Sequence, residues 1–257
     1  MIALKRLVLA AACLLLAGDG LAQEGPVPVS MADYLQGRGV FQTQCAPCHG
    51  KTGRGDGEWA KGVETKPRNF REGLFKFRTT PAGKLPTDAD LLRTLREGVS
   101  GTMMPAFTQM PDRDLRAVIA YIKSFSPRWK DPANYAAAVE LPELPEWWVR
   151  RSERTRHASE AAATFAQVCA ACHGAGGKGD GPAVKAAPMM DAWGFPIKPA
   201  DLTLPHSKSG ARPQDLFRTI ALGLDGTPMA GQLEALGAEM IWNLVAYLDE
   251  MKEAAAK

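Results

Sequence analysis

Two short motifs in the sequence place a histidine directly after a pair of cysteines, with the same spacing each time. The first motif consists of Cys45, Cys48 and His49, and the second consists of Cys169, Cys172 and His173. Two thiols three residues apart can each add to one vinyl group of the same porphyrin, and the adjoining histidine then reaches the iron as its proximal ligand. The motifs therefore predict two covalently attached haem c groups, each with an iron bound by a histidine.

Three other uses of paired cysteines compete with haem attachment. Zinc modules usually bring their Cys-x-x-Cys pairs together within a short separation, whereas here each pair lies in its own half of the chain. A thioredoxin-like redox pair accompanies a βαβ pattern, and none is visible. An exported chain can form structural disulfides, but these would not explain the histidine after each pair. Haem attachment is favoured because it accounts for all three residues of each motif.

The ligand on the other side of each iron separates an electron carrier from an enzyme. Met104 follows His49 by 55 residues, and Met229 follows His173 by 56, each shortly after a Gly-Thr pair. A single methionine is more often a core residue, but recurrence at a matched position favours iron ligation at both. Methionine in this position raises the reduction potential and leaves no open site for a substrate.

Other residues compete for the same role. Met103 stands beside Met104, and we favour Met104 because Pro105 follows it. His157 lies early in a predicted helix and His206 lies in a loop; both are expected at the surface, with iron ligation as the alternative.

The chain surrounding the motifs is duplicated at an offset of 124 residues. Phe41 and Phe165 stand four residues before their motifs, and both motifs are followed by Gly-x-x-Gly-x-Gly-Asp-Gly. Helical spacing and end signals predict six helices. Their approximate ranges are 30–49, 87–97 and 111–125 in the first copy and 152–170, 213–222 and 238–255 in the second. No region alternates with period two, so we expect an all-α fold with little strand.

Four segments are expected along the chain. Residues 1–22 have the charged start, short apolar run and small-residue cleavage site of a secretory signal peptide, cleaved near Ala22. Residues 23–126 and 152–257 form two haem domains, joined by the proline-rich linker 127–151. The apolar run is too short to span a bilayer and no later stretch does so, which predicts a periplasmic protein without an integral membrane segment.

The charge balance limits the classes of partner. The 257 residues include 31 basic and 28 acidic side chains, a net charge of +3, which argues against a nucleic-acid binder. The balance is +5 over residues 31–126 and −2 over residues 152–257. One hypothesis is that the first domain docks an acidic partner; the alternative is that these charges are solvated surface.

Each half resembles a class I c-type cytochrome, over roughly residues 31–125 and 152–250. The whole resembles the two-domain, dihaem cytochromes that carry electrons in bacterial periplasms. The resemblance implies helices wrapped around each haem, with the terminal helices of each half crossing at aromatic and small residues. These residues would be Phe41, Tyr121 and Gly37 in the first half and Phe165, Tyr247 and Ala161 in the second. It also implies that Lys76 or Arg78 pairs with haem carboxylates.

The function implied is electron transport between periplasmic redox proteins, with both irons bound by histidine and methionine and with no catalytic residues. One alternative is a dihaem enzyme of the peroxidase type, in which one iron has an open or displaceable sixth position. The other is a cytochrome subunit of a larger dehydrogenase or terminal oxidase complex. The expected partners are other redox proteins, and one of them could be a membrane-bound redox complex.

Overall fold

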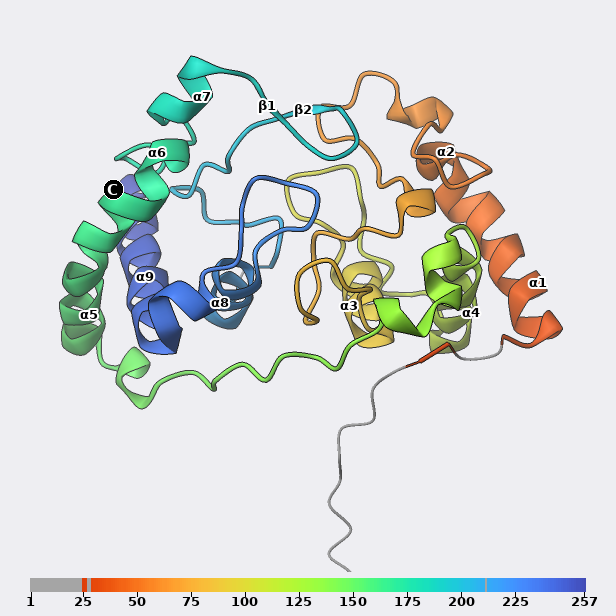
Figure 1. Ribbon diagram of the computed structural model, residues 1–257, viewed down its shortest axis with the longest axis horizontal. Coiled ribbons are helices and arrows are strands. Elements are labelled where there is room, and N and C mark those ends of the chain that lie inside the picture. Colours follow the sequence, from red (N-terminus) through yellow and green to blue (C-terminus); the bar gives the residue numbers. More distant parts are fainter. Residues whose placement is uncertain (1–24, 27–28, 211) are drawn as a thin grey trace, which may run out of the picture.

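The computed structural model describes residues 25–26, 29–210 and 212–257, so the predicted signal peptide lies outside the described residues. Two helical halves lie side by side, with α3 and α8 towards the middle and the pairs α1–α4 and α5–α9 on the outer sides (Figure 1). An extended segment connects the halves along one edge. Only two short strands occur among the described residues, and the all-α prediction is confirmed.

The elements repeat from one half to the other. The first half contains α1 (Met31–Val40), α2 (Ala46–His49), α3 (Asp88–Glu97) and α4 (Asp112–Lys123). The second contains α5 (Arg151–Thr164), α6 (Ala170–His173), α7 (Pro182–Ala186), α8 (Pro213–Leu222) and α9 (Leu233–Ala255), with β1 (Met189–Met190) paired antiparallel to β2 (Pro196–Ile197). Short 3-10 helices lie at Glu58–Ala60, Phe70–Glu72, Pro127–Lys130, Pro132–Asn134 and Glu146–Val149.

Local end signals fix the two middle helices. Thr87 caps α3 through a capping box with Asp90, and Gly98 ends the helix with a φ of 67° that favours glycine. Pro213 occupies the first turn of α8, and Gly223 ends it with a φ of 69°. The predicted ranges of both helices are confirmed.

Both haem motifs sit at the end of a helix that contains a π-helical turn. This turn covers Phe41–Cys45 between α1 and α2, and Phe165–Cys169 between α5 and α6. π-Helical turns inside α-helices are rare and occur often at functional sites. Their recurrence at the first cysteine of each motif indicates that the duplication extends to backbone conformation.

The terminal helices of each half cross at the residues that the family resemblance identified. Phe41 packs on Tyr121 with ring centroids 5.3 Å apart, and Phe165 packs on Tyr247 at 5.1 Å. Gly37 is needed at the first crossing because a Cβ there would overlap the carbonyl group of Ala117. The same side of the second crossing contains the fully buried Ala161. These crossings hold each motif against its own core.

The segment between the halves packs along both of them. Trp129 and Tyr135 belong to the core of the first half. Trp147 and Trp148 are half-buried against the core of the second half. This packing limits how far the two halves can move apart.

A buried ion pair joins the halves directly. Arg78 is 2% exposed, and its guanidinium donates to both carboxylate oxygens of Asp225 at 2.5 and 2.7 Å and to the carbonyl oxygen of Leu222 at 3.0 Å. The amide of Gly83 donates to the same carboxylate at 3.0 Å. Arg78 therefore fastens the two halves together and does not line the cavity beside the first motif, so that of the two residues expected near haem carboxylates only Lys76 lies there. Among the described helices, none is both long and apolar enough to cross a membrane.

Candidate functional site

An apolar cavity of about 230 Å³ lies beside the first motif. Cys45, Cys48 and His49 line it from the end of the first helix, and Met104 lines it from the loop before α4. The remaining wall is mainly hydrophobic. It includes Phe70, Phe75, Phe77, Leu91, Leu95, Val99, Phe107 and Ile122. The sequence-predicted residues of the first half are therefore brought together around one cavity.

The ring of His49 is held by a hydrogen bond and by an aromatic contact. Its Nδ1 donates to the carbonyl oxygen of Arg68 at 3.0 Å, because a carbonyl can only accept. Phe70 stacks on the ring, with centroids 4.6 Å apart and an interplanar angle of 21°. Burial lowers the pKa of His49 from its ordinary value of 6.5. The imidazole is thus neutral at neutral pH, with Nε2 free of its proton and able to bind a metal.

The cysteines of each motif lie in pairs, and no disulfide joins the four described cysteines. Burial, with the neighbouring charge of Cys48, raises the pKa of Cys45 to about 12. The first pair and the pair at Cys169 and Cys172 stay in separate halves. No cluster of three or more His, Cys, Asp or Glu side chains among the described residues could hold a metal ion. This separation disfavours the zinc alternative.

The loop that carries Met104 is closed by a set of hydrogen bonds. The amide of Val99 donates to the carbonyl oxygen of Met104 at 3.1 Å. The hydroxyl of Thr102 donates to the carbonyl oxygen of Val99 at 2.7 Å and accepts from the amide of Met104 at 3.1 Å. Met104 is half-buried against the core, whereas Met103 is 70% exposed. Both methionines line the cavity, and Met104 is the more deeply enclosed of the two.

The second half repeats this loop bond for bond. The amide of Leu224 donates to the carbonyl oxygen of Met229 at 2.9 Å. The hydroxyl of Thr227 donates to Leu224 at 2.7 Å, and the amide of Met229 donates to that hydroxyl at 3.2 Å. Met229 occupies the position of Met104 and not that of Met103, which supports our choice between the two neighbours.

The second histidine is held in the same way but is less enclosed. Nδ1 of His173 donates to the carbonyl oxygen of Ala200 at 3.2 Å, and burial lowers its pKa from 6.5. The amide of Leu202 donates to Gly177 at 2.7 Å, as the amide of Phe70 donates to Gly53 in the first half. Leu202 therefore occupies the position of Phe70 in the repeat, so the residue that stacks on His49 in the first half is replaced by an aliphatic one in the second.

The residues around the first cavity fit a covalently bound haem. Thiols, a neutral imidazole and a thioether converge on a space with hydrophobic walls, and basic side chains lie at its edge. Arg68 and Phe70 were not identified from the sequence. The internal repeat contains a signal for them, because Lys66-Pro67 recurs as Lys198-Pro199 and the residues that follow hold the two histidines.

Of the two other histidines, His206 has the surface position expected for it and His157 does not. His157 is only 6% exposed, so its expected surface position was wrong. Trp147 covers its ring with centroids 3.8 Å apart, and its Nδ1 lies 2.9 Å from the amide oxygen of Asn243. His206 is exposed and lies against Gly101 in the loop before Met104. Neither lines the first cavity.

Comparison with known proteins gives matches in both halves. Residues 32–122 match the family model described as cytochrome c oxidase, cbb3-type, subunit III. Residues 158–252 match the model described as cytochrome c. No curated protein sequence matches the chain. Among solved structures, a chain of the reducing HAO-like protein complex of Kuenenia stuttgartiensis is 35% identical, with a TM-score of 0.76 over 89% of this chain and 99% of that chain.

Proposed function

This chain belongs to the c-type cytochromes, with two cytochrome c domains in tandem, and we propose that it passes single electrons between redox proteins through two haems with histidine and methionine ligands. Cytochrome c domains bind covalently attached haem c, so two domains hold two haems. When bound, each haem supplies a one-electron ferric–ferrous couple. The chain itself attaches, orients and shields the group.

We assign the attachment and ligand residues by their places in the repeat. Cys45 and Cys48 would hold the first haem and Cys169 and Cys172 the second. The iron ligands would be His49 with Met104, and His173 with Met229. The observation that carries this assignment is the matched loop, in which the same three hydrogen bonds present a methionine in each half.

The lining of the first cavity favours a carrier over an enzyme of the peroxidase type. Such an enzyme needs a free coordination position and a nearby acid or base on that side. The described residues that line the cavity include no Asp or Glu and no histidine other than His49. With Met104 as the second iron ligand, the lining would offer neither a free coordination position nor a carboxylate or second histidine to act as the acid or base.

The optical spectrum and the reaction with peroxide test this choice. We expect the purified, oxidised protein to contain low-spin haem throughout and to give no steady-state turnover of hydrogen peroxide with an electron donor. High-spin haem together with peroxide turnover would contradict the carrier and favour the enzyme.

A second candidate function is that of a cytochrome subunit in a larger oxidoreductase complex. The similar solved chain is part of a complex, and the likeness covers nearly all of both chains. Trp59 and Met103, 66% and 70% exposed, lie on the first cavity's lining. Large apolar side chains exposed at such a rim are typical of protein contacts. Haem-stained fractions from native cells, separated by size, distinguish the candidates: a complex elutes far above the mass of one mature chain, and a free carrier elutes near that mass.

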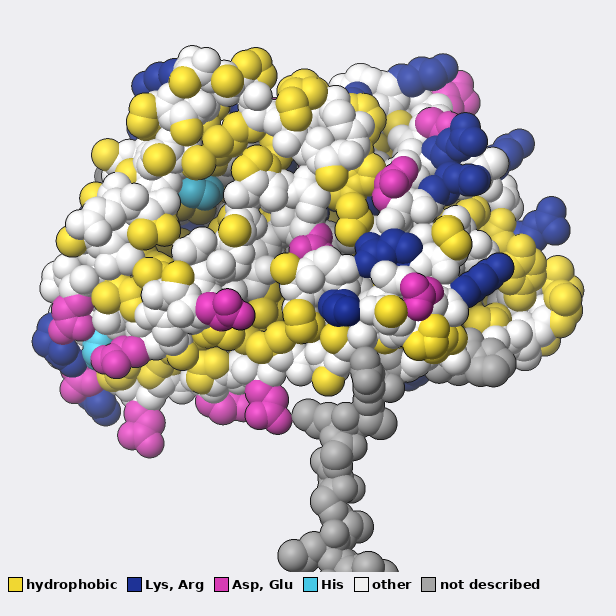
Figure 2. Space-filling view, viewed as in Figure 1, with side chains coloured by type: hydrophobic (Ala, Val, Ile, Leu, Met, Phe, Trp, Pro, Cys, Tyr) yellow, Lys and Arg dark blue, Asp and Glu magenta, His cyan; other side chains and the backbone are white. Residues whose placement is uncertain are grey.

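The distribution of charge bears on the docking partner. In Figure 2, Lys and Arg side chains gather over the first half, while Asp and Glu side chains lie along the lower edge of the second half and of the connecting segment. We propose that the first domain meets an acidic redox partner and that the protein works in the periplasm, where haem c is attached. Association that slows as ionic strength rises would support the docking proposal, and a rate independent of salt would refute it.

A further inference from the structure

Three basic side chains from two different domains meet at the edge of the first cavity. Arg68 and Lys76 come from the first domain, and Lys208 comes from the loop before α8 in the second. We call these three residues the two-domain basic cluster. All three line the cavity of about 230 Å³ that holds the first haem motif. The wall of the first cofactor site is therefore completed by the second domain.

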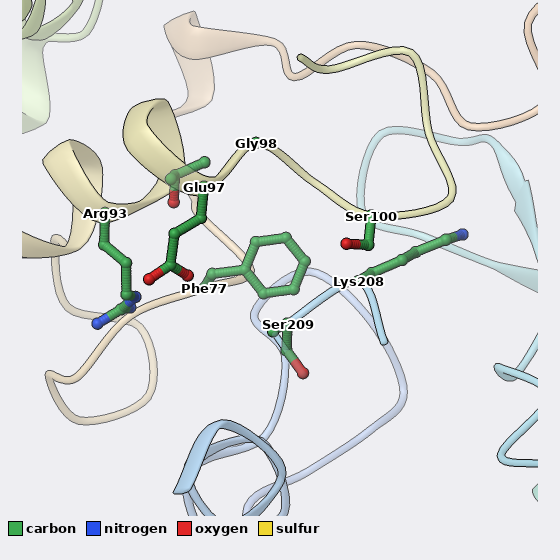
Figure 3. A pocket seen from close by; sticks show the side chains of 9 residues that line it. Phe77, Arg93, Glu97, Gly98, Ser100, Lys208 and Ser209 are labelled. Atoms are coloured by element: carbon green, nitrogen blue, oxygen red, sulfur yellow. The ribbon is translucent and has the colours of Figure 1, made fainter. Parts of the chain in front are cut away.

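Lys208 reaches the cavity across the boundary between the domains. Its Nζ donates to the hydroxyl of Thr65, another residue of the cavity wall, at 3.2 Å. Figure 3 shows a small crevice beside Lys208, lined by Phe77 of the first domain and by Lys208 and Ser209 of the second. The side chain of Lys208 runs past Ser100, and its ammonium group points away from that crevice (Figure 3).

A second segment of the second domain holds the other two cations. Asp191 and Trp193 lie between β1 and β2, the strand pair that reaches over the middle of the molecule (Figure 1). The guanidinium carbon of Arg68 lies 3.6 Å from the centroid of the Trp193 ring, a cation–π contact. Nζ of Lys76 lies 3.9 Å from Oδ2 of Asp191. Both cations of the first domain are thus positioned by residues of the second.

The cluster contains three cationic side chains, and the carboxylates of the described residues do not neutralise all three. Asp191 is the one carboxylate within ion-pair distance of any of the three cations among the described residues. Burial, helped by the charges of Arg68 and Lys208, lowers the pKa of Lys76 to about 8, although Asp191 opposes this shift. Burial also lowers the pKa of Arg68 to about 10. Partly buried cations beside an apolar cavity are stabilised by an anion, and a haem brings two carboxylates.

We infer that the two-domain basic cluster binds the carboxylates of the first haem, so that Lys208 of the second domain helps to set the reduction potential of the haem in the first. This inference rests on the proposed function of the two domains. A positive charge near a haem favours the ferrous state, which carries one positive charge fewer than the ferric state. Loss of the Lys208 charge should therefore lower the potential of the first haem.

The test compares three full-length variants by redox titration monitored optically. K208Q removes the charge from the cluster, and K208R keeps it. K185Q removes the same charge from an exposed position of α7 in the same domain. A C45A/C48A variant, which should keep only the second haem, identifies which step of the titration belongs to which haem.

For K208Q we expect the reduction equilibrium of the first haem to fall about two- to fivefold, the size typical of a partly exposed charge pair. The second haem should be unchanged, K208R should resemble the unaltered protein, and K185Q should leave both haems unaffected. An unchanged first haem in K208Q, or an equal shift in K185Q, would overturn the inference. Failure of the proposed function would look different, because the unaltered protein would then lack two low-spin haems.

Discussion

The two domains carry the same motif on the same π-helical turn, yet they enclose their sites to different degrees. In the first domain Cys45 is 8% exposed and Phe70 stacks on His49. In the second domain Cys169 is half-buried, and Leu202 lies where the first domain has Phe70. The first site is also covered by loops from the second domain.

This difference shows how a duplicated domain can give two unequal redox sites without changing a ligand. Burial disfavours the more highly charged ferric state, and the cations beside the first cavity act in the same direction. We therefore expect the first haem to have the higher reduction potential. At equilibrium the first haem would be reduced preferentially. The less enclosed second haem would exchange electrons more readily with other redox proteins.

Removing the attachment cysteines should produce the largest effect. Each of the double variants C45A/C48A and C169A/C172A should lose one of two covalent haems, measured as haem per chain after denaturation. The first variant should also lower the midpoint of thermal unfolding more than the second, because its haem fills the more enclosed site. Equal losses of stability would show that the two sites are enclosed to the same degree.

Breaking the ion pair between the domains should come next. R78M leaves the carboxylate of Asp225 without its main partner, and loss of one member of a buried pair costs about 3–5 kcal/mol. R113M removes an arginine whose side chain is 83% exposed and should change the unfolding free energy by less than about 0.5 kcal/mol.

The double variant R78M/D225L provides the matching control. It replaces both charges with apolar groups and should recover most of the stability lost in R78M, as measured by denaturant unfolding. A loss below about 1 kcal/mol in R78M would mean that the domains do not depend on this contact.

Exchanging Phe70 and Leu202, which occupy the same position of the repeat, tests the difference between the two sites in more detail. F70L removes the ring that stacks on His49 and should cost about 1 kcal/mol in unfolding free energy, since it shortens a buried side chain. It should also lower the potential of the first haem toward that of the second. L202F should have the opposite effect on the second haem. If both reduction potentials stay unchanged in these variants, the residue at this position of the repeat does not affect the potential of the haem.

The smallest expected effect is on the unfolding free energy at low pH, to which Asp215 at the start of α8 contributes. Burial alone would raise the pKa of Asp215, but hydrogen bonds from Arg212 and the charges of Arg218 and Arg212 hold it below the ordinary value of 3.8. The stabilisation is present above pH 3.8 and is lost as the pH falls through the lower pKa of the folded state. D215N should remove this part of the pH dependence of the unfolding free energy. If the unfolding free energy of D215N falls below pH 3.8 as steeply as that of the unaltered protein, the prediction is contradicted.

The sequence predicts those parts of the molecule that depend on local or repeated signals. Thr87 with Gly98, and Pro213 with Gly223, are sufficient to place α3 and α8. Pro105 directly after Met104 is the local signal that favours Met104 over Met103, a choice that stays a prediction until the ligands are observed.

Contacts between distant residues could not be predicted in this way. Arg78 meets Asp225 147 positions away, and Lys208 donates to Thr65 143 positions away. Neither contact has a periodic pattern, because it depends on how the two domains dock. His157 is buried for the same kind of reason, since it is the path of the connecting segment that brings Trp147 over its ring.

The far-red absorption band of the oxidised protein tests the central claim most directly, because it reports a methionine bound to ferric haem. The account predicts a band intensity that corresponds to both haems, about half of which is lost in M104A and about half in M229A, while M103A leaves it unchanged. A band that corresponds to one haem only, or a band that survives either replacement in full, would contradict it.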